Sequence, residues 1–140
     1  MPMQVELVSP EEILFTGEAT MVLARTSSGE IAFLPGHVPF VGVLSGKSAL
    51  RIWMTDGTIR SIAVHSGFVE VSHDRVTILS DVAELPANID VARAQRAKDA
   101  AEARLRERAD DEDAIAALAR ANLRLTVAGA GSTATHAAAH

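Results

Sequence analysis

The stretch that decides the fold runs from Ala49 to Val64 and reads ALRIWMTDGTIRSIAV. Two short apolar runs, Ala49–Met54 and Thr58–Val64, flank the dipeptide Asp56-Gly57. An Asp-Gly pair between apolar runs is the strongest short-range signal of a β-hairpin, because Asp and Gly accept the positive φ angles of a tight turn. The sequence therefore predicts two antiparallel strands joined at this turn.

Similar runs lie on both sides of this hairpin as far as residue 86. They are rich in Val, Ile, Leu and Phe, and turn signals such as Ser72-His73-Asp74-Arg75 separate them. The further runs are Val5–Val8, Ile13–Phe15, Met21–Arg25, Ile31–Leu34, Val41–Leu44, Phe68–Val71 and Val76–Leu79. Because no helical period separates these runs, we expect an antiparallel β-sandwich, or a barrel, rather than a βαβ fold.

The composition changes after Glu84-Leu85-Pro86. Residues 88–109 are dominated by alanine and charged residues, which is typical of a solvent-facing helix. The acidic run 110–113 predicts a turn, and its last residue, Asp113, is expected to cap a second helix. The predicted buried stripe of that helix consists of Ile115, Leu118, Ala119, Asn122 and Leu125.

Together these patterns predict an α+β protein. An N-terminal antiparallel β-sandwich (residues 1–86) is followed by a C-terminal antiparallel two-helix hairpin (87–128) and a low-complexity, disordered tail (129–140). The hairpin contains few large apolar residues, so its folding must offset backbone entropy of about 1–2 kcal/mol per residue with little apolar burial. We therefore expect it to detach easily from the sandwich.

The charge is distributed unevenly over the 140 residues, whose net charge is −5. Residues 1–86 are acidic, residues 87–128 are neutral, and residues 91–109 alone carry a net charge of +3. This basic strip is either a solvated helix face or a surface that docks on an acidic protein. Nucleic acid is disfavoured as a partner, because no aromatic residue lies between the charges and the whole chain is acidic.

Composition also restricts the compartment and the chemistry. Cysteine is absent, which excludes disulfides and thiolate chemistry, and no apolar run approaches the ~18–20 residues of a membrane span. Residues 1–4 do not resemble a secretory signal, so we expect a cytosolic protein. His65-Ser66 with Asp81 suggests a catalytic group and His37, His65 and His73 a metal site, but their spacings match no known motif. We therefore expect neither catalysis nor a bound metal.

The segment Ile89-Asp90-Val91-Ala92-Arg93-Ala94 is the strongest candidate for a binding site. Asp90 can cap a helix that carries Arg93 in its first turn, and Arg120 and Arg124 are four residues apart on one face of the second helix. In an antiparallel hairpin these three guanidinium groups converge at its base and repel one another unless an anion lies between them. The base of the hairpin is thus a candidate phosphate site. The alternative is that Asp90 only caps the helix and the arginines are solvated.

The chain resembles the epsilon subunit of bacterial rotary ATP synthases from about residue 4 to residue 127. The resemblance is carried by Val5–Pro10 with Phe15-Thr16-Gly17, by Gly29–Pro39 (GEIAFLPGHVP) and by Ser66–Val71, where Ser66-Gly67 replaces the usual pair of glycines. It implies a non-catalytic subunit of the central stalk, whose sandwich contacts the gamma subunit and the proteolipid ring of the membrane sector. The positions of Glu30 and His37 imply contact with that ring.

The resemblance also implies a regulatory hairpin that inhibits ATP hydrolysis. When extended, the hairpin would reach a catalytic beta subunit, with a contact surface formed by Arg96, Lys98, Arg104, Arg106 and Arg108. When folded, it binds ATP in some members of the family, here through Ile89, Asp90, Arg93, Ala94, Arg120 and Arg124, with Glu84 lining the same site. ATP would be a regulatory ligand rather than a substrate, and a role for Mg²⁺ stays open.

The implied location is the cytoplasmic face of the bacterial plasma membrane, as a peripheral part of the synthase without membrane insertion. Two alternatives stay open. One is the same coupling and inhibitory subunit without ATP sensing, and the other is a generic β-sandwich adaptor protein.

Overall fold

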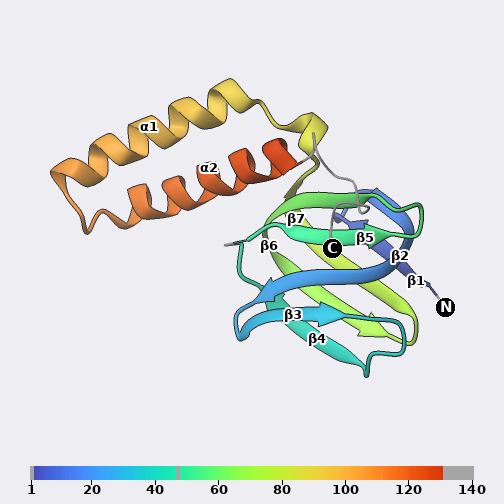
Figure 1. Ribbon diagram of the computed structural model, residues 1–140. Helices are drawn as coiled ribbons and strands as arrows, with labels where there is room; N and C mark the ends of the chain where they lie inside the picture. Colours follow the sequence, from blue (N-terminus) through green and yellow to red (C-terminus); the bar gives the residue numbers. More distant parts are fainter. Residues whose placement is uncertain (1, 47, 131–140) are drawn as a thin grey trace.

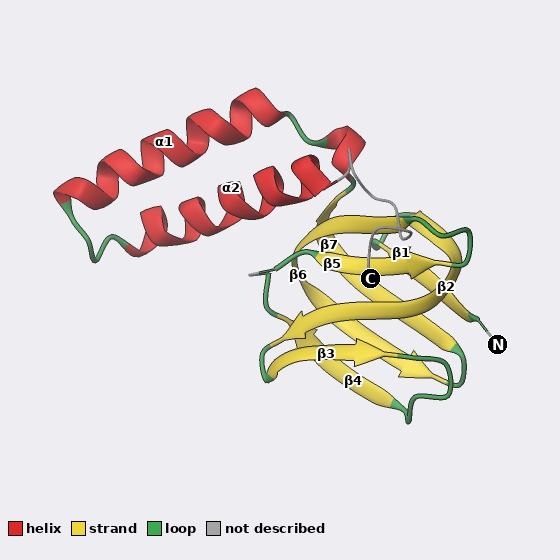
Figure 2. Cartoon of the chain, in the orientation of Figure 1, coloured by secondary structure: helices red, strands yellow, loops and turns green. Residues whose placement is uncertain are grey.

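The computed structural model describes residues 2–46 and 48–130. This part of the chain forms seven strands, a short 3-10 turn and two helices (Figures 1 and 2). The strands are β1 (Met3–Val8), β2 (Ile13–Thr26), β3 (Gly29–Phe33), β4 (Phe40–Leu44), β5 (Leu50–Met54), β6 (Ile59–Ser72) and β7 (Arg75–Glu84). The turn η1 (Pro86–Asn88) leads to α1 (Val91–Glu107) and α2 (Glu112–Ala130). The predicted β-sandwich followed by two helices is confirmed.

The two longest strands, β2 and β6, hold the sandwich together. Each extends across both layers: β2 pairs with β1, β5, β3 and β4, and β6 pairs with β5, β4 and β7. The expected hairpin joins β5 to β6, and the Asp56 side chain accepts hydrogen bonds from both the N–H and the hydroxyl of Thr58 in its turn. One pairing, β1 with β7, is parallel, which is possible because the rest of the sandwich connects them.

Two pairs of predicted runs turned out to be single strands. Ile13–Phe15 and Met21–Arg25 both belong to β2, and Thr58–Val64 and Phe68–Val71 are largely the two halves of β6. The register of each long strand shifts within it, in β6 between Val64 and Phe68. Such bulges bend a strand without ending it. Gly67, with φ of +154°, lies in the β6 bulge, where an added Cβ would collide with the carbonyl group of Leu79.

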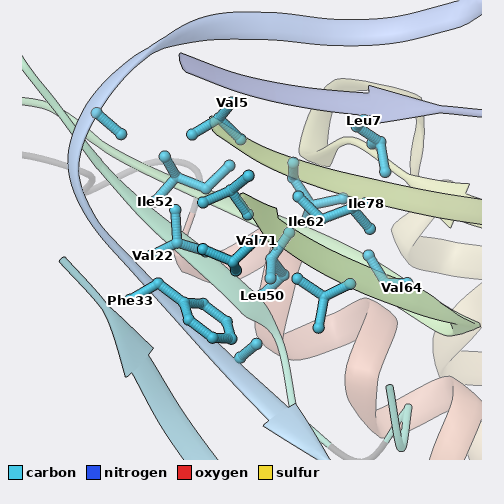
Figure 3. Close-up of a cluster of buried hydrophobic side chains, with 14 of the residues drawn as sticks. Val5, Leu7, Val22, Phe33, Leu50, Ile52, Ile62, Val64, Val71 and Ile78 are labelled. Atoms are coloured by element: carbon cyan, nitrogen blue, oxygen red, sulfur yellow. The ribbon is translucent and has the colours of Figure 1, made fainter. Parts of the chain in front are cut away.

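The sandwich encloses one large apolar core. Buried and more exposed residues alternate along β1, as expected for a strand with one buried face, whereas β6 is buried at four consecutive residues, 61–64, where Ala63 faces the hairpin. Figure 3 shows the centre of this core, with Val5, Leu7, Val22, Phe33, Leu50, Ile52, Ile62, Val64, Val71 and Ile78 labelled. Burial of this many large side chains makes the sandwich the stable part of the molecule.

The two helices lie side by side and antiparallel, and the hairpin extends away from the sandwich (Figure 1). They meet through small residues, since Ala94 and Ala101 of α1 and Ala114 and Ala121 of α2 are buried. The predicted stripe on α2 was therefore partly wrong. Ile115 is 50% exposed, and Asn122 and Ala119 are exposed as well. The alanines allow the helix backbones to approach closely, which displaces the larger side chains from the seam.

The turn at the tip of the hairpin is closed by Asp111. Its carboxylate accepts a hydrogen bond from the Ala114 N–H at 3.0 Å, so Asp111, and not the predicted Asp113, caps α2. Arg104 donates from Nε and Nη2 to the same carboxylate at 2.9–3.2 Å. The Ala114 N–H and then Arg104 lower the pKa of Asp111. Of the predicted tail, Gly129 and Ala130 belong to α2, and the remainder lies outside the described residues.

Candidate functional site at the base of the helical hairpin

The path from the sandwich to the hairpin begins at Glu84, the last residue of β7. Pro86 starts the turn η1, and Ile89 is buried directly after it. The Asp90 carboxylate then accepts a hydrogen bond from the Arg93 N–H at 3.0 Å. Asp90 is thus the N-cap of α1, as the sequence predicted, and this cap sets the direction in which α1 leaves the sandwich.

Glu84 joins three elements of the fold. Its Oε1 accepts a hydrogen bond from Nε of Arg124 on α2 at 2.7 Å, and it lies 2.8 Å from Nε2 of His65 on β6. The side chains of Glu84 and Arg124 are 27% and 30% exposed, and that of His65 only 6%. Burial raises the pKa of Glu84, but the hydrogen bonds from Arg124 and His65 outweigh it and hold this pKa below its ordinary value of 4.5. Glu84 is therefore a carboxylate at neutral pH.

An apolar cluster beside Glu84 supports this contact. Leu123 and Val127 of α2 pack with Ile89 and with Ala63 of β6, and all four are buried. This cluster is small compared with the core of the sandwich. Figure 1 shows the consequence: the C-terminal end of α2 lies near the sandwich, while the tip of the hairpin projects away from it.

The other predicted ATP-binding residues differ in how close they lie to the Glu84–Arg124 contact. Arg120, one turn before Arg124, borders a pocket of about 440 Å³ whose other walls include His65 and the Ser45-Gly46 turn. Arg93 is exposed, and its side chain makes no hydrogen bond or ion pair within the described residues. Ala94 is buried in the α1–α2 seam. The structure thus brings Glu84, Ile89 and Arg124 together, with Arg120 in the adjoining pocket.

His65 is the residue of this site that the sequence reasoning did not assign to it. Its sequence context suggests only a catalytic or metal-binding role. A polar ring directly after the apolar run Ile62–Val64 of a buried strand signals a side chain that needs a polar partner. That partner, Glu84, is 19 residues away in the chain.

The residues predicted to contact the ring lie at opposite ends of β3. Glu30 is exposed near its start and borders a groove of about 590 Å³ between the sandwich and α2. His37 follows the end of β3, where its ring packs edge-on against Phe33 at 5.0 Å and its Nδ1 lies 2.7 Å from the carbonyl oxygen of Val38. The His37 side chain therefore helps to order its own loop.

The basic residues of α1 are mostly exposed. Arg96 and Arg106 are exposed to solvent, and Lys98 is half-buried. Arg104 is held by Asp111, and Arg108 lies 3.6 Å from Asp110 in an exposed ion pair. Two of the five predicted beta-subunit contacts are thus already paired with acids at the tip of the hairpin.

Within residues 2–46 and 48–130, no three His, Asp or Glu side chains gather as metal ligands. No helix in this part of the chain is long and apolar enough to cross a membrane. The fold and the contacts at the base of the hairpin define the class of protein. It is a β-sandwich that carries a two-helix hairpin, and the hairpin is docked at its base by one carboxylate and a small apolar cluster.

The chain belongs to the family of ATP synthase delta/epsilon chains. The beta-sandwich domain of this family matches residues 2–86, and its long alpha-helix domain matches residues 87–129.

Individual relatives agree with this assignment. The chain is 46% identical over 127 residues to the ATP synthase epsilon chain of Thermobifida fusca, covering 89% of this chain and 90% of the relative. It is 43% identical over 131 residues to that of Halalkalibacterium halodurans, covering 91% and 97%. Among solved structures, a chain of the Euglena gracilis mitochondrial ATP synthase (OSCP/F1/c-ring) is similar in fold. Its TM-score is 0.66 at 22% identity, and the match covers 99% of this chain and 82% of that one.

Proposed function

We propose that this protein is a non-catalytic subunit of the central stalk of a bacterial, proton-translocating ATP synthase. The observation that carries the proposal is that both halves of the chain match one family in order, and that the match covers 90% and 97% of the two epsilon chains described above. In this role it couples the gamma subunit to the proteolipid ring. It is then a peripheral component at the cytoplasmic face of the plasma membrane.

An exposed apolar surface on the sandwich supports docking to a neighbouring subunit, which we propose is gamma. It lies on β4, β6 and β7 and borders a groove of about 460 Å³. Its members are Val41, Val43, Phe68, Leu79 and Val82, each more than 40% exposed. Contiguous exposed apolar side chains are typical of an interaction surface. Glu30 and His37 stay candidates for contact with the ring, at the two ends of β3.

The weak docking of the hairpin supports a regulatory role. Within residues 2–46 and 48–130, the Glu84–Arg124 hydrogen bond and one small apolar cluster join α2 to the sandwich, so the hairpin can separate there while the core of the sandwich stays intact. A released hairpin can present Arg96, Lys98 and Arg106 to an acidic segment of a catalytic beta subunit and so inhibit ATP hydrolysis. Arg104 and Arg108 would first have to exchange their partners at the tip.

ATP is the ligand we propose for the docked state. Arg124, Arg120 and Arg93 are the candidate phosphate ligands, and Asp90 and Glu84 can accept hydrogen bonds from the base or ribose. Ligand bound only to the docked state stabilises it by RT ln(1 + [ATP]/Kd), about 2.7 kcal/mol at a hundredfold excess over Kd. The hairpin would then be released when ATP falls.

Calorimetry on the full chain tests ATP sensing. We expect heat of binding at millimolar ATP, a loss of affinity in Arg93→Ala and Arg124→Ala, and no change in Arg75→Ala, whose ion pair with Glu6 lies within the sandwich. Repeating the titration with EDTA in place of Mg²⁺ establishes whether the metal takes part. No heat in the parent protein would reject ATP sensing and leave the stalk role, which co-purification with a gamma subunit tests separately.

A subunit that couples and inhibits without sensing ATP is the second candidate. It is favoured by one observation: the Glu84 carboxylate lies 2.7 Å from Nε of Arg124 and so neutralises its charge from within the chain. The hairpin base therefore does not need an anion to avoid repulsion between arginines.

A further inference from the structure

A single carboxylate oxygen connects the two halves of the molecule. Glu84 Oε1 lies 2.7 Å from Nε of Arg124 on the hairpin and 2.8 Å from Nε2 of His65 on the sandwich. The His65 side chain is almost fully enclosed, whereas the other two are partly exposed. The direction in which Glu84 points is thus constrained by the most buried member of the three.

The hydrogen-bond role of each His65 ring nitrogen follows from its surroundings. Nδ1 is buried and has no hydrogen-bond partner within the described residues. Nε2 faces the carboxylate of Glu84, which can only accept, so Nε2 is the donor of this hydrogen bond.

The backbone holds His65 in place. It lies in β6 at the first of two register shifts, between the buried Val64 and Ser66, where no residue of β7 is paired with it. The backbone of Gly46, whose φ is +73°, packs against the backbone of His65. A Cβ added to Gly46 would collide with the His65 carbonyl oxygen. His65 is thus a fixed donor, and Glu84 and Arg124 are the groups that adjust to it.

We propose that His65 is a positioning residue that holds Glu84 toward Arg124 and so latches the hairpin to the sandwich without ligand. We call His65, Glu84 and Arg124 the base latch. Arg124 uses Nε in this contact, which leaves the N–H groups of its two Nη nitrogens outside it. A phosphate can accept hydrogen bonds from these N–H groups, so the latch orients the Arg124 guanidinium for binding the nucleotide. This second effect rests on the proposed ATP binding.

The ligand-free protein tests the latch first. The chain has no cysteine, so Glu70→Cys on β6 and Glu107→Cys at the end of α1 can carry two spin labels. Electron spin resonance then measures the distance between the sandwich and the hairpin. We expect His65→Leu to raise the undocked fraction about tenfold, the effect of one hydrogen bond to a charged group. His65→Gln keeps an N–H donor and should restore docking.

Two controls separate positioning from packing. Arg75→Ala, which breaks the exposed Arg75–Glu6 pair between β7 and β1, should leave the distances unchanged. In an Arg124→Ala background, His65→Leu should have no further effect, because the group through which it acts is gone. Unchanged distances in His65→Leu, equal undocking in His65→Gln, or additive effects with Arg124→Ala would each overturn the proposal. Thermal unfolding of the sandwich verifies that each variant is folded.

ATP titration then tests the orientation of Arg124. We expect His65→Leu to bind ATP about tenfold more weakly than the parent, and His65→Gln to bind nearly as well. Equal affinity in His65→Leu would overturn this effect of the latch. If the parent itself does not bind ATP, the proposed ATP sensing fails, while the distances in the ligand-free protein still decide the latch.

Discussion

Truncation of Leu123 should release the hairpin and leave the sandwich intact. Leu123 is 4% exposed and packs with Val127, Ile89 and Ala63 in the small cluster that docks α2. A buried Leu→Ala change costs about 2–5 kcal/mol, and the lower half applies here because a small cluster at an edge can collapse or separate. A loss of about 2–3 kcal/mol corresponds to a shift of roughly 30- to 150-fold in the docking equilibrium.

Hydrogen exchange read by mass spectrometry measures this shift element by element. Peptides from α1 and α2 should exchange faster in Leu123→Ala, and peptides from β1 and β7 should keep their protection. Ile115→Ala is the matched control, since Ile115 lies on the same helix but is 50% exposed. Similar exchange in the two variants, or loss of protection in β1 and β7 together with the helices, would refute an independently docked hairpin.

Three further predictions concern single interactions. Asp90→Ala removes the α1 cap and should destabilise the hairpin by about 1 kcal/mol in thermal unfolding followed by circular dichroism, with Asp90→Ser close to the parent. The pKa of Glu84 is lowered in the docked state, so its carboxylate stabilises docking above the ordinary pKa of 4.5, and this stabilisation is lost as the pH falls through the lowered pKa. Spin-label distances should therefore show undocking in acid, and this acid undocking should be absent in Glu84→Gln. Gly67→Ala should destabilise the sandwich by more than 1 kcal/mol in urea, since its Cβ meets the Leu79 backbone; an unchanged midpoint would contradict this.

Local patterns predicted the fold well and strand continuity less well. Asp56-Gly57 and the alternation around it identified the β5–β6 hairpin, because such a turn depends only on neighbouring residues. Gly67 looked like the boundary between two strands, and so did the small residues near Gly17. A glycine inside a strand and a glycine in a turn have the same sequence signature, and strand pairing distinguishes them: Gly67 lies at a register shift of β6, and Gly17 is paired regularly with Val5.

In the candidate site too, a contact between neighbouring residues was predictable and a contact between distant residues was not. The Asp90 cap was predictable because its acceptor and donor are three residues apart. The partner of Arg124 was not, because Glu84 lies 40 residues away and is brought close by the docking of α2. From the sequence, Arg93, Arg120 and Arg124 were predicted to repel one another unless an anion lies between them. It contained the carboxylate that neutralises Arg124, but no local pattern assigned the pair.

The two ends of the hairpin are held by different means, and this bears on how it can be released. At the tip, Arg104 and the Ala114 N–H bind Asp111, and every one of these groups belongs to the hairpin itself. At the base, Glu84 and His65 belong to the sandwich. Undocking therefore breaks the base contacts and leaves the tip intact, so the helices can separate from the sandwich as a pair. Because the docking surface is small, a ligand or a proton that changes one contact at the base can shift a large part of this equilibrium.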